Sequence, residues 1–188
     1  MAALGIVQHP DPILAGHALP FELPAEAAAA QVAFERLRGI ADRVLAVHPS
    51  RKGLGVAGPQ IGIERRIAIF RPWGGGGDVC LLNAEIISTS DNADVRYEGC
   101  LSLFDVRGAV RRPLAVTIRA QNFDGTPWED TYCNAAARLV CHELDHLDGR
   151  LYIDRMDGAA PISAEEYRRL PDTDWNYWRQ RERKRKPR

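Results

Sequence analysis

The pentapeptide His142-Glu-Leu-Asp-His146 restricts the structure of this chain more than any other segment. Two histidines four positions apart project from one face of an α-helix, so their imidazoles can share a metal ion. Glu143 follows the first histidine directly, where a base for a water molecule on that metal belongs. The alternative is a solvated, charged helix face, and these five residues alone do not separate the two interpretations.

The residues around this pentapeptide predict the ends of its helix. Asn134 is a favourable N-cap residue, and the predicted helix runs from there through His146. Gly149 is placed to end it. A separate, N-terminal helix is predicted over residues 25–47, because apolar side chains recur there at helical spacing.

Short β-branched segments bounded by turn residues predict strands in the middle of the chain. Residues 122–125 predict a hairpin turn, and residues 163–170 predict a last helix that begins with a capping box. This order predicts an α+β fold with mostly antiparallel sheets, an N-terminal helix and a C-terminal extension. The predicted strands cover residues 66–70, 79–82, 85–89, 114–121 and 128–133.

The 188-residue chain has the composition of a single globular domain, with 45% hydrophobic and 27% charged residues. Its net charge of zero is unevenly distributed, since residues 168–188 carry nine basic and three acidic side chains. We therefore predict one domain over residues 1–167 and a basic tail. No segment approaches the roughly 18 consecutive apolar residues of a membrane span, and the N-terminus lacks the features of a signal peptide. Four cysteines are too few for a disulfide scaffold, so we expect a cytoplasmic protein.

Two histidines leave a metal site incomplete, and two kinds of third ligand are available. A downstream carboxylate, Glu165 or Glu166, would give the site of a zinc endopeptidase. Cys100 lies upstream, and one thiolate with two imidazoles binds Zn²⁺ or Fe²⁺ while leaving a position for water. A purely structural metal would need a fourth protein ligand, such as Cys133, and would leave Glu143 unexplained. We otherwise expect the remaining cysteines to be small buried hydrophobic residues: Cys80, Cys133 and Cys141.

Three segments taken together resemble the peptide deformylase family. The family signatures are GxGxAAxQ, EGCLS and HExDH, and the chain contains GLGVAGPQ (residues 53–60), EGCLS (98–102) and HELDH (142–146) in the same order. The departure from these signatures is Gly58, where the family has alanine. The resemblance extends over residues 5–157, because residues 7–14 look like the family's N-terminal segment and residues 146–155 like the strand that follows its helix.

The resemblance implies a catalytic domain whose sheets pack around the central, histidine-bearing helix. It also implies that the domain binds one divalent metal through Cys100, His142 and His146. The family uses Fe²⁺ in many bacteria and also accepts Zn²⁺ or Ni²⁺. The implied reaction removes the N-formyl group from formyl-methionine at the N-terminus of nascent polypeptides and releases formate. By the same resemblance Glu143 is the general base, while the Gln60 side chain and the Leu101 N–H stabilise the oxyanion.

The resemblance also implies how the peptide binds. The backbone around Gly55 hydrogen-bonds an extended peptide, and Arg107 lies near the mouth of the site. The methionine pocket is implied to consist of His142 and the residues Leu54, Arg96, Ala135, Arg138 and Leu139. Arg96 and Arg138 stand where the family has aliphatic residues, which leaves open a relative that acts on a different N-formyl peptide or small amide. An inactive binding homologue is a further alternative.

The resemblance carries two expectations about assembly. Monomer is the usual state of the family, and its bacterial members use a C-terminal extension to dock on the ribosome. The basic residues 179–188 are a candidate counterpart of that extension.

Overall fold

The structure is a computed structural model that describes residues 1–49, 53–72, 77–158 and 160–171. It contains three α-helices, nine strands and short 3₁₀ segments within these ranges. The helices are α1 (Ala27–Val47), α2 (Ala135–Leu147) and α3 (Ala164–Arg169). The strands are β1 (Leu54–Ala57), β2 (Ile67–Arg71), β3 (Val79–Leu82), β4 (Glu85–Thr89), β5 (Ala93–Cys100), β6 (Leu103–Pro113), β7 (Ala115–Gln121), β8 (Pro127–Cys133) and β9 (Ile162–Ser163).

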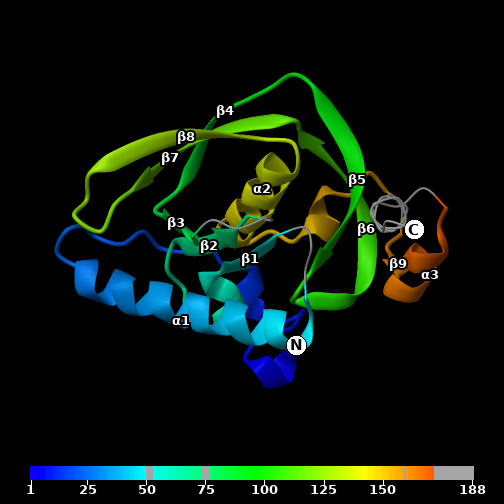
Figure 1. The fold of residues 1–188 in the computed structure, drawn as a ribbon, viewed down its shortest axis with the longest axis horizontal. Helices are drawn as coiled ribbons and strands as arrows, with labels where there is room; N and C mark the ends of the chain where they lie inside the picture. The colour runs from blue at the N-terminus through cyan, green and yellow to red at the C-terminus, as the bar shows by residue number, and fades with distance from the viewer. Residues whose placement is uncertain (50–52, 73–76, 159, 172–188) are drawn as a thin grey trace, which may run out of the picture.

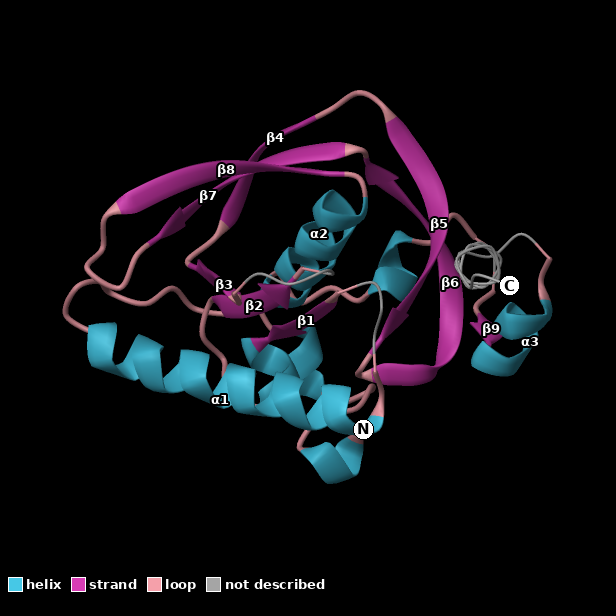
Figure 2. Ribbon diagram, in the orientation of Figure 1, coloured by secondary structure: helices cyan, strands magenta, loops and turns pink. Residues whose placement is uncertain are grey.

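The strands form three antiparallel sheets. Their orders are β1-β2-β3, β4-β7-β8 and β5-β6-β9. Figure 1 shows α2 in the middle of the molecule, with α1 below it, the sheet of β4, β7 and β8 above it, and β5 and β6 to one side. The same view coloured by secondary structure (Figure 2) shows that strands surround α2 on several sides. The predicted α+β fold with a central histidine-bearing helix is therefore confirmed.

The apolar faces of the two long helices determine where the core lies. The apolar side of α1 packs on β1 and β2, with Leu37, Ile40 and Val44 buried against Val56 and Ile69. A second apolar cluster joins α2 to the sheets β1-β2-β3 and β4-β7-β8. Its buried side chains include Ala68, Phe70, Leu81, Val116, Ile118, Val140, Leu144 and Leu147. Helix α2 is thus held by apolar contacts along one side, and its remaining side is available for polar residues.

Most of the predicted elements lie where the sequence places them. The two predicted helices match α1 and α2, and the five predicted strands match β2, β3, β4, β7 and β8 within one residue or so. Ser163 caps α3 as expected, because its side chain accepts a hydrogen bond from Glu166 N–H at 3.0 Å. Asn134 does precede α2, but it makes no capping bond through its side chain and has a positive φ of 55°.

Three local expectations are wrong or incomplete. Residues 146–155 do not continue into a strand: Tyr152–Arg155 is a 3₁₀ turn, closed where Asp154 accepts a hydrogen bond from Leu151 N–H at 2.7 Å. Cys133 is exposed, whereas Cys141 is buried as expected. Strands β1, β5, β6 and β9 were not predicted. The first three mix glycine and charged residues with apolar ones and do not alternate cleanly, and β9 has two residues.

The structure explains why Gly58 replaces the alanine of the family signature. A Cβ atom at this position would lie 2.8 Å from the carbonyl oxygens of Ile63 and Arg65. Both obstacles are backbone atoms, which cannot move aside as a side chain can. The loop that follows Gln60 therefore packs too closely on residue 58 for any side chain here.

The C-terminal segment is partly described. Strand β9 pairs with β6 and leads into α3, which extends to Arg169 and so contains the predicted boundary at residue 167. The rest of the predicted basic tail, residues 172–188, lies outside the described residues. None of the described helices is long and apolar enough to cross a membrane.

Candidate metal centre

Cys100, His142 and His146 form a buried cluster. One potential ligand atom from each residue lies within 4.8 Å of the other two, and this is the group of potential metal ligands found within the described residues. The Cys100 Sγ atom is 3.2 Å from His146 Nε2. The two histidines lie one turn apart on α2, and Cys100 ends β5. The fold thus brings the upstream cysteine to the helix face that carries both imidazoles.

Gln60 lies beside the cysteine of this cluster. Its side-chain Nε2 is 3.4 Å from Cys100 Sγ and 3.2 Å from Ser102 Oγ, and its Oε1 accepts a hydrogen bond from Ala57 N–H. The side chain is buried and points its N–H groups toward the cluster. Gln60 is therefore positioned to donate a hydrogen bond to an oxygen held there.

Glu143 is buried next to the cluster, with 2% of its surface exposed. Its Oε2 has no hydrogen-bond partner among the described residues. Strand β1 passes so closely that a Cβ on Gly55 would overlap the carboxylate. Burial raises the pKa of Glu143 to about 7. A carboxylate with such a pKa can accept and return a proton near neutral pH.

Glu98 connects His142 to a buried ionic network. Its Oε2 lies 3.0 Å from His142 Nδ1, and Arg112 contacts both carboxylate oxygens at 3.0 Å. Arg112 also donates to Asp145 at 2.5 Å, and Asp145 accepts from Arg155. Burial opposes ionisation of Glu98, but the hydrogen bonds from His142 and Arg112 outweigh it and hold the Glu98 pKa well below its usual range. Glu98 therefore orients the His142 ring so that Nε2 is directed to the cluster.

The cluster also favours the thiolate form of Cys100. Burial opposes this charge, yet the adjacent imidazoles of His146 and His142 lower the Cys100 pKa well below its usual value. The other buried cysteine, Cys141, has no such neighbours, and burial raises its pKa to about 11. Of these two thiols, Cys100 is the one prepared to bind a metal.

The residues implied in peptide binding occupy different environments. Leu54 and Gly55 lie in β1, Arg107 bonds the carbonyl oxygens of Phe104 and Val106, and Leu139 is half-buried on α2. Arg138 reaches the network at Glu98. Arg96 is 53% exposed and pairs with Asp94, and Ala135 is exposed at the first turn of α2, so neither is brought to the metal ligands.

The alternative ligands are not brought to the cluster. Glu165 and Glu166 lie in the first turn of α3 and are exposed, and Cys133 is exposed at the end of β8. None of the three belongs to the group of potential metal ligands in the described ranges. The zinc endopeptidase arrangement and the closed structural site therefore have no support in the fold.

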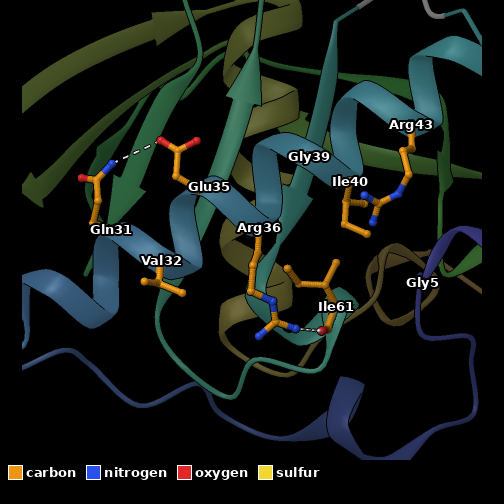
Figure 3. Close-up of a pocket in the computed structure, with 9 residues that line it drawn as sticks. All are labelled: Gly5, Gln31, Val32, Glu35, Arg36, Gly39, Ile40, Arg43 and Ile61. Atoms are coloured by element: carbon orange, nitrogen blue, oxygen red, sulfur yellow. Dashed lines mark hydrogen bonds between the residues drawn. The ribbon is translucent and has the colours of Figure 1, made fainter.

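A groove of about 630 Å³ beside α1 is separate from this centre (Figure 3). It is lined by residues of α1 together with Gly5 and Ile61, and Arg36 reaches across it toward the Ile61 carbonyl. No residue of the metal cluster lines it. The groove is therefore not part of the candidate site.

A model of the polypeptide deformylase family matches residues 3–161. This match covers most of the chain, including every segment that contributes to the cluster. The chain belongs to the polypeptide deformylase family. Family membership makes the chain an enzyme of a metal-dependent class, in agreement with the Cys-His-His cluster.

Individual relatives agree with this assignment. A peptide deformylase of Acidobacterium capsulatum is 38% identical over 157 residues, which cover 80% of this chain and 85% of the relative. The structure also resembles the crystal structure of peptide deformylase from Thermotoga maritima, with a TM-score of 0.67 at 30% identity over 81% of this chain and 96% of that chain. A ligand-bound class I type b peptide deformylase from Acinetobacter baumannii gives a TM-score of 0.71 at 29% identity, over 81% and 97% of the two chains.

The donor set fits the divalent metal that the family requires. One thiolate and two imidazoles are the ligands that Zn²⁺ and Fe²⁺ accept in sites that keep an open position for water. The partnerless Glu143 Oε2 lies beside this set, which is where a proton acceptor is needed. The residues present therefore fit a divalent metal, and the same donor set accepts either Zn²⁺ or Fe²⁺.

Several residues around the centre have contacts that their sequence positions do not predict. Glu98 and Asp145 at least lie within two of the three signature segments, so a motif points to them. No motif or periodicity points to Arg112 or Tyr152. Arg112 reaches the network because β6 pairs with β5, and the Tyr152 ring stacks on His142 with centroids 6.2 Å apart.

Proposed function

We propose that Cys100, His142 and His146 hold the metal of a peptide deformylase, and that the residues around them carry out the removal of formyl groups from nascent polypeptides. The observation that supports this assignment is the convergence of the three ligands with a buried carboxylate, Glu143, that has no other partner. A divalent metal bound there supplies Lewis acidity, which lowers the pKa of a water molecule and polarises the formyl carbonyl. Fe²⁺ is the proposed native ion, with Zn²⁺ or Ni²⁺ as functional substitutes.

Each protein group around the metal then has a separate role in the hydrolysis of the formyl amide. Glu143 accepts a proton of the attacking water and later delivers it to the nitrogen, so that the amine leaves in its neutral form. The other product is formic acid, which loses its proton to solvent and becomes formate. The Gln60 side chain and the Leu101 backbone N–H donate to the carbonyl oxygen as negative charge develops on it. Glu98 keeps His142 in the orientation that the ligand set needs.

The peptide binds along β1. Within the described residues this strand pairs with β2 on one edge, and its Gly55 lies over Glu143. An extended peptide can add to the other edge through backbone hydrogen bonds, which tolerate many sequences. We propose that the formyl-methionine side chain lies near Leu54 and Leu139, and that Arg107 lies near the following residues. Arg96, Ala135 and Arg138 complete the proposed surroundings of the peptide.

Formate release from formyl-Met-Ala-Ser, with protein purified without oxygen, tests the assignment. We expect turnover with about one equivalent of metal, and a loss of about 10²–10⁴-fold in Glu143→Gln. Glu165→Gln is the matched control and keeps full activity. Cys100→Ser must lose metal, whereas an endopeptidase using Glu165 or Glu166 would keep it. A metal-loaded chain that leaves this peptide intact but acts on another N-formyl compound would instead support the specialised relative.

The cellular setting is proposed from the same family. We propose a cytoplasmic monomer whose basic residues 179–188 contact the ribosome. Truncation before Arg179 should then abolish a salt-sensitive association with ribosomes while leaving turnover of the short peptide unchanged. Equal association of the full and truncated chains would remove the tail from this proposal.

A further inference from the structure

The proposed metal ligands lie on elements that pack into two different apolar clusters. Helix α2, which carries His142 and His146, packs its apolar side into a cluster that contains no residue of β5 or β6. Cys100 lies instead in a small cluster with Val110 and Tyr152, which contains no residue of α2. Apolar packing by itself therefore does not place the thiol opposite the imidazoles. Hydrogen bonds of the buried ionic network join α2 to the β5–β6 hairpin.

Arg138 contacts both strands of the β5–β6 hairpin from α2. From α2 its Nη1 donates to Glu98 Oε1 at 2.7 Å and to the Val110 carbonyl at 2.9 Å. Its Nη2 donates to the Asp94 carbonyl at 3.0 Å and to Asp94 Oδ1 at 2.7 Å. The side chain is 14% exposed. One guanidinium thus connects α2 to both strands of the β5–β6 hairpin, in which Cys100 is the last residue of β5.

We propose that Arg138 is a positioning residue of the metal centre, which clamps the histidine-bearing helix against the cysteine-bearing hairpin. The inference rests on the proposed metal site and gives Arg138 a role in holding the metal ligands, in addition to its proposed place beside the peptide. Arg112 orients the Glu98 carboxylate but lies within the hairpin, so it reaches α2 only through Asp145. Arg138 lies one turn before His142 and holds the same carboxylate from the helix side. The planar fork of arginine is suited to such a multiple contact, and lysine is not.

A purely electrostatic role for Arg138 would change the metal affinity in the opposite direction. The sign of the change in affinity therefore tests the proposal. A guanidinium near the ligands repels a cation and withdraws negative charge from Glu98. If that were its main effect, removing Arg138 would strengthen metal binding. If Arg138 instead pre-organises the three ligands, its removal weakens binding, as loss of groups that support metal ligands commonly does.

Binding of Co²⁺ to the metal-free full-length chain measures this directly, because the absorption bands of Co²⁺ report the thiolate ligand and the coordination number. The dissociation constant is obtained by competition with a chelator. We expect Arg138→Met to bind Co²⁺ about tenfold more weakly than the wild type. Arg138→Lys should be weakened almost as much, because it keeps the charge and loses the fork. Asp94→Asn should be weakened less, because it loosens the clamp without touching Glu98.

Arg119→Met is the matched control. Arg119 also pairs with two carboxylates, Glu85 and Glu129, but it lies on β7 at the surface. The Co²⁺ affinity of the Arg119→Met variant should therefore equal that of the wild type. Urea unfolding of the metal-free variants identifies any variant that fails to fold. If the Arg138 variants do not fold, the Co²⁺ affinity of Asp94→Asn tests the proposal instead. Unchanged or tighter binding in a folded Arg138→Met chain overturns the clamp alone. Absence of Co²⁺ binding in the wild type would overturn the proposed metal site together with it.

Discussion

At the scale of single residues, the closest fit in the site is between Gly55 and Glu143. Glycine at this position lets β1 pass directly over a buried carboxylate, since any Cβ would overlap it. The same proximity excludes water from one side of the carboxylate and contributes to its raised pKa. The glycine of the 53–60 segment is thus part of the environment of Glu143, beyond its expected contact with a peptide.

Replacing Gly55 by alanine should therefore displace the Glu143 carboxylate. We expect turnover of formyl-Met-Ala-Ser to fall by about 10²-fold, because a shift of about 1 Å at a reacting group has effects of that order. Metal content should be unchanged. Gly16→Ala is the control, since a Cβ there meets its nearest atom at 3.6 Å. Full activity in Gly55→Ala would show that Glu143 tolerates a different position.

At the scale of elements, the β5–β6 hairpin and α2 meet through charges. Glu98 and Arg112 come from the two strands of the hairpin, and Asp145 comes from the helix. All three side chains are almost fully buried. Such a network is costly to desolvate and contributes modest net stability, but removing one member leaves its partners charged and buried.

Arg112→Met should accordingly destabilise the fold by about 3–5 kcal/mol, the usual cost of breaking a buried ion pair from one side. Equilibrium unfolding in urea measures this difference. Arg119→Met, which breaks exposed pairs on β7, should cost about 0–1 kcal/mol. A loss below about 1 kcal/mol in Arg112→Met would mean that water replaces the guanidinium inside the network.

At the scale of the whole molecule, the proposed metal ligands come from distant parts of the chain. Cys100 and His146 are far apart in sequence, and their atoms approach to 3.2 Å only in the folded state. A metal bound by this set therefore stabilises the folded chain and not the unfolded one.

Removal of the metal should lower the thermal stability of the protein. Saturation at about 100 times the dissociation constant corresponds to about 2.7 kcal/mol. For a chain of this length, the melting temperature should then fall by roughly 5–10 °C on chelation. Calorimetry before and after dialysis against a chelator measures the shift. Cys100→Ser should show little or no shift, and an equal shift in both chains would place the stabilising metal elsewhere.

The elements predicted correctly are those whose signal is local. The long helix α1 and the strand β7 have clear apolar periodicity, and α2 carries the histidine motif on one face. Strands β5 and β6 were not predicted because their buried side chains include Glu98 and Arg112. These two residues pair with each other and with polar residues of α2. Apolar patterning does not detect a strand whose buried face is ionic.

The sequence by itself determined the helix with two histidines and a glutamate between them, and the resemblance of three short segments identified the family. The tertiary structure decided the rest: that Cys100 rather than Glu165 or Glu166 faces those histidines, and that Arg138 turns toward Glu98 and Asp94. The physical reason is the range of the interactions. Helix periodicity is set by neighbouring residues, whereas a ligand set and a buried ion pair depend on which strands pair and which faces meet.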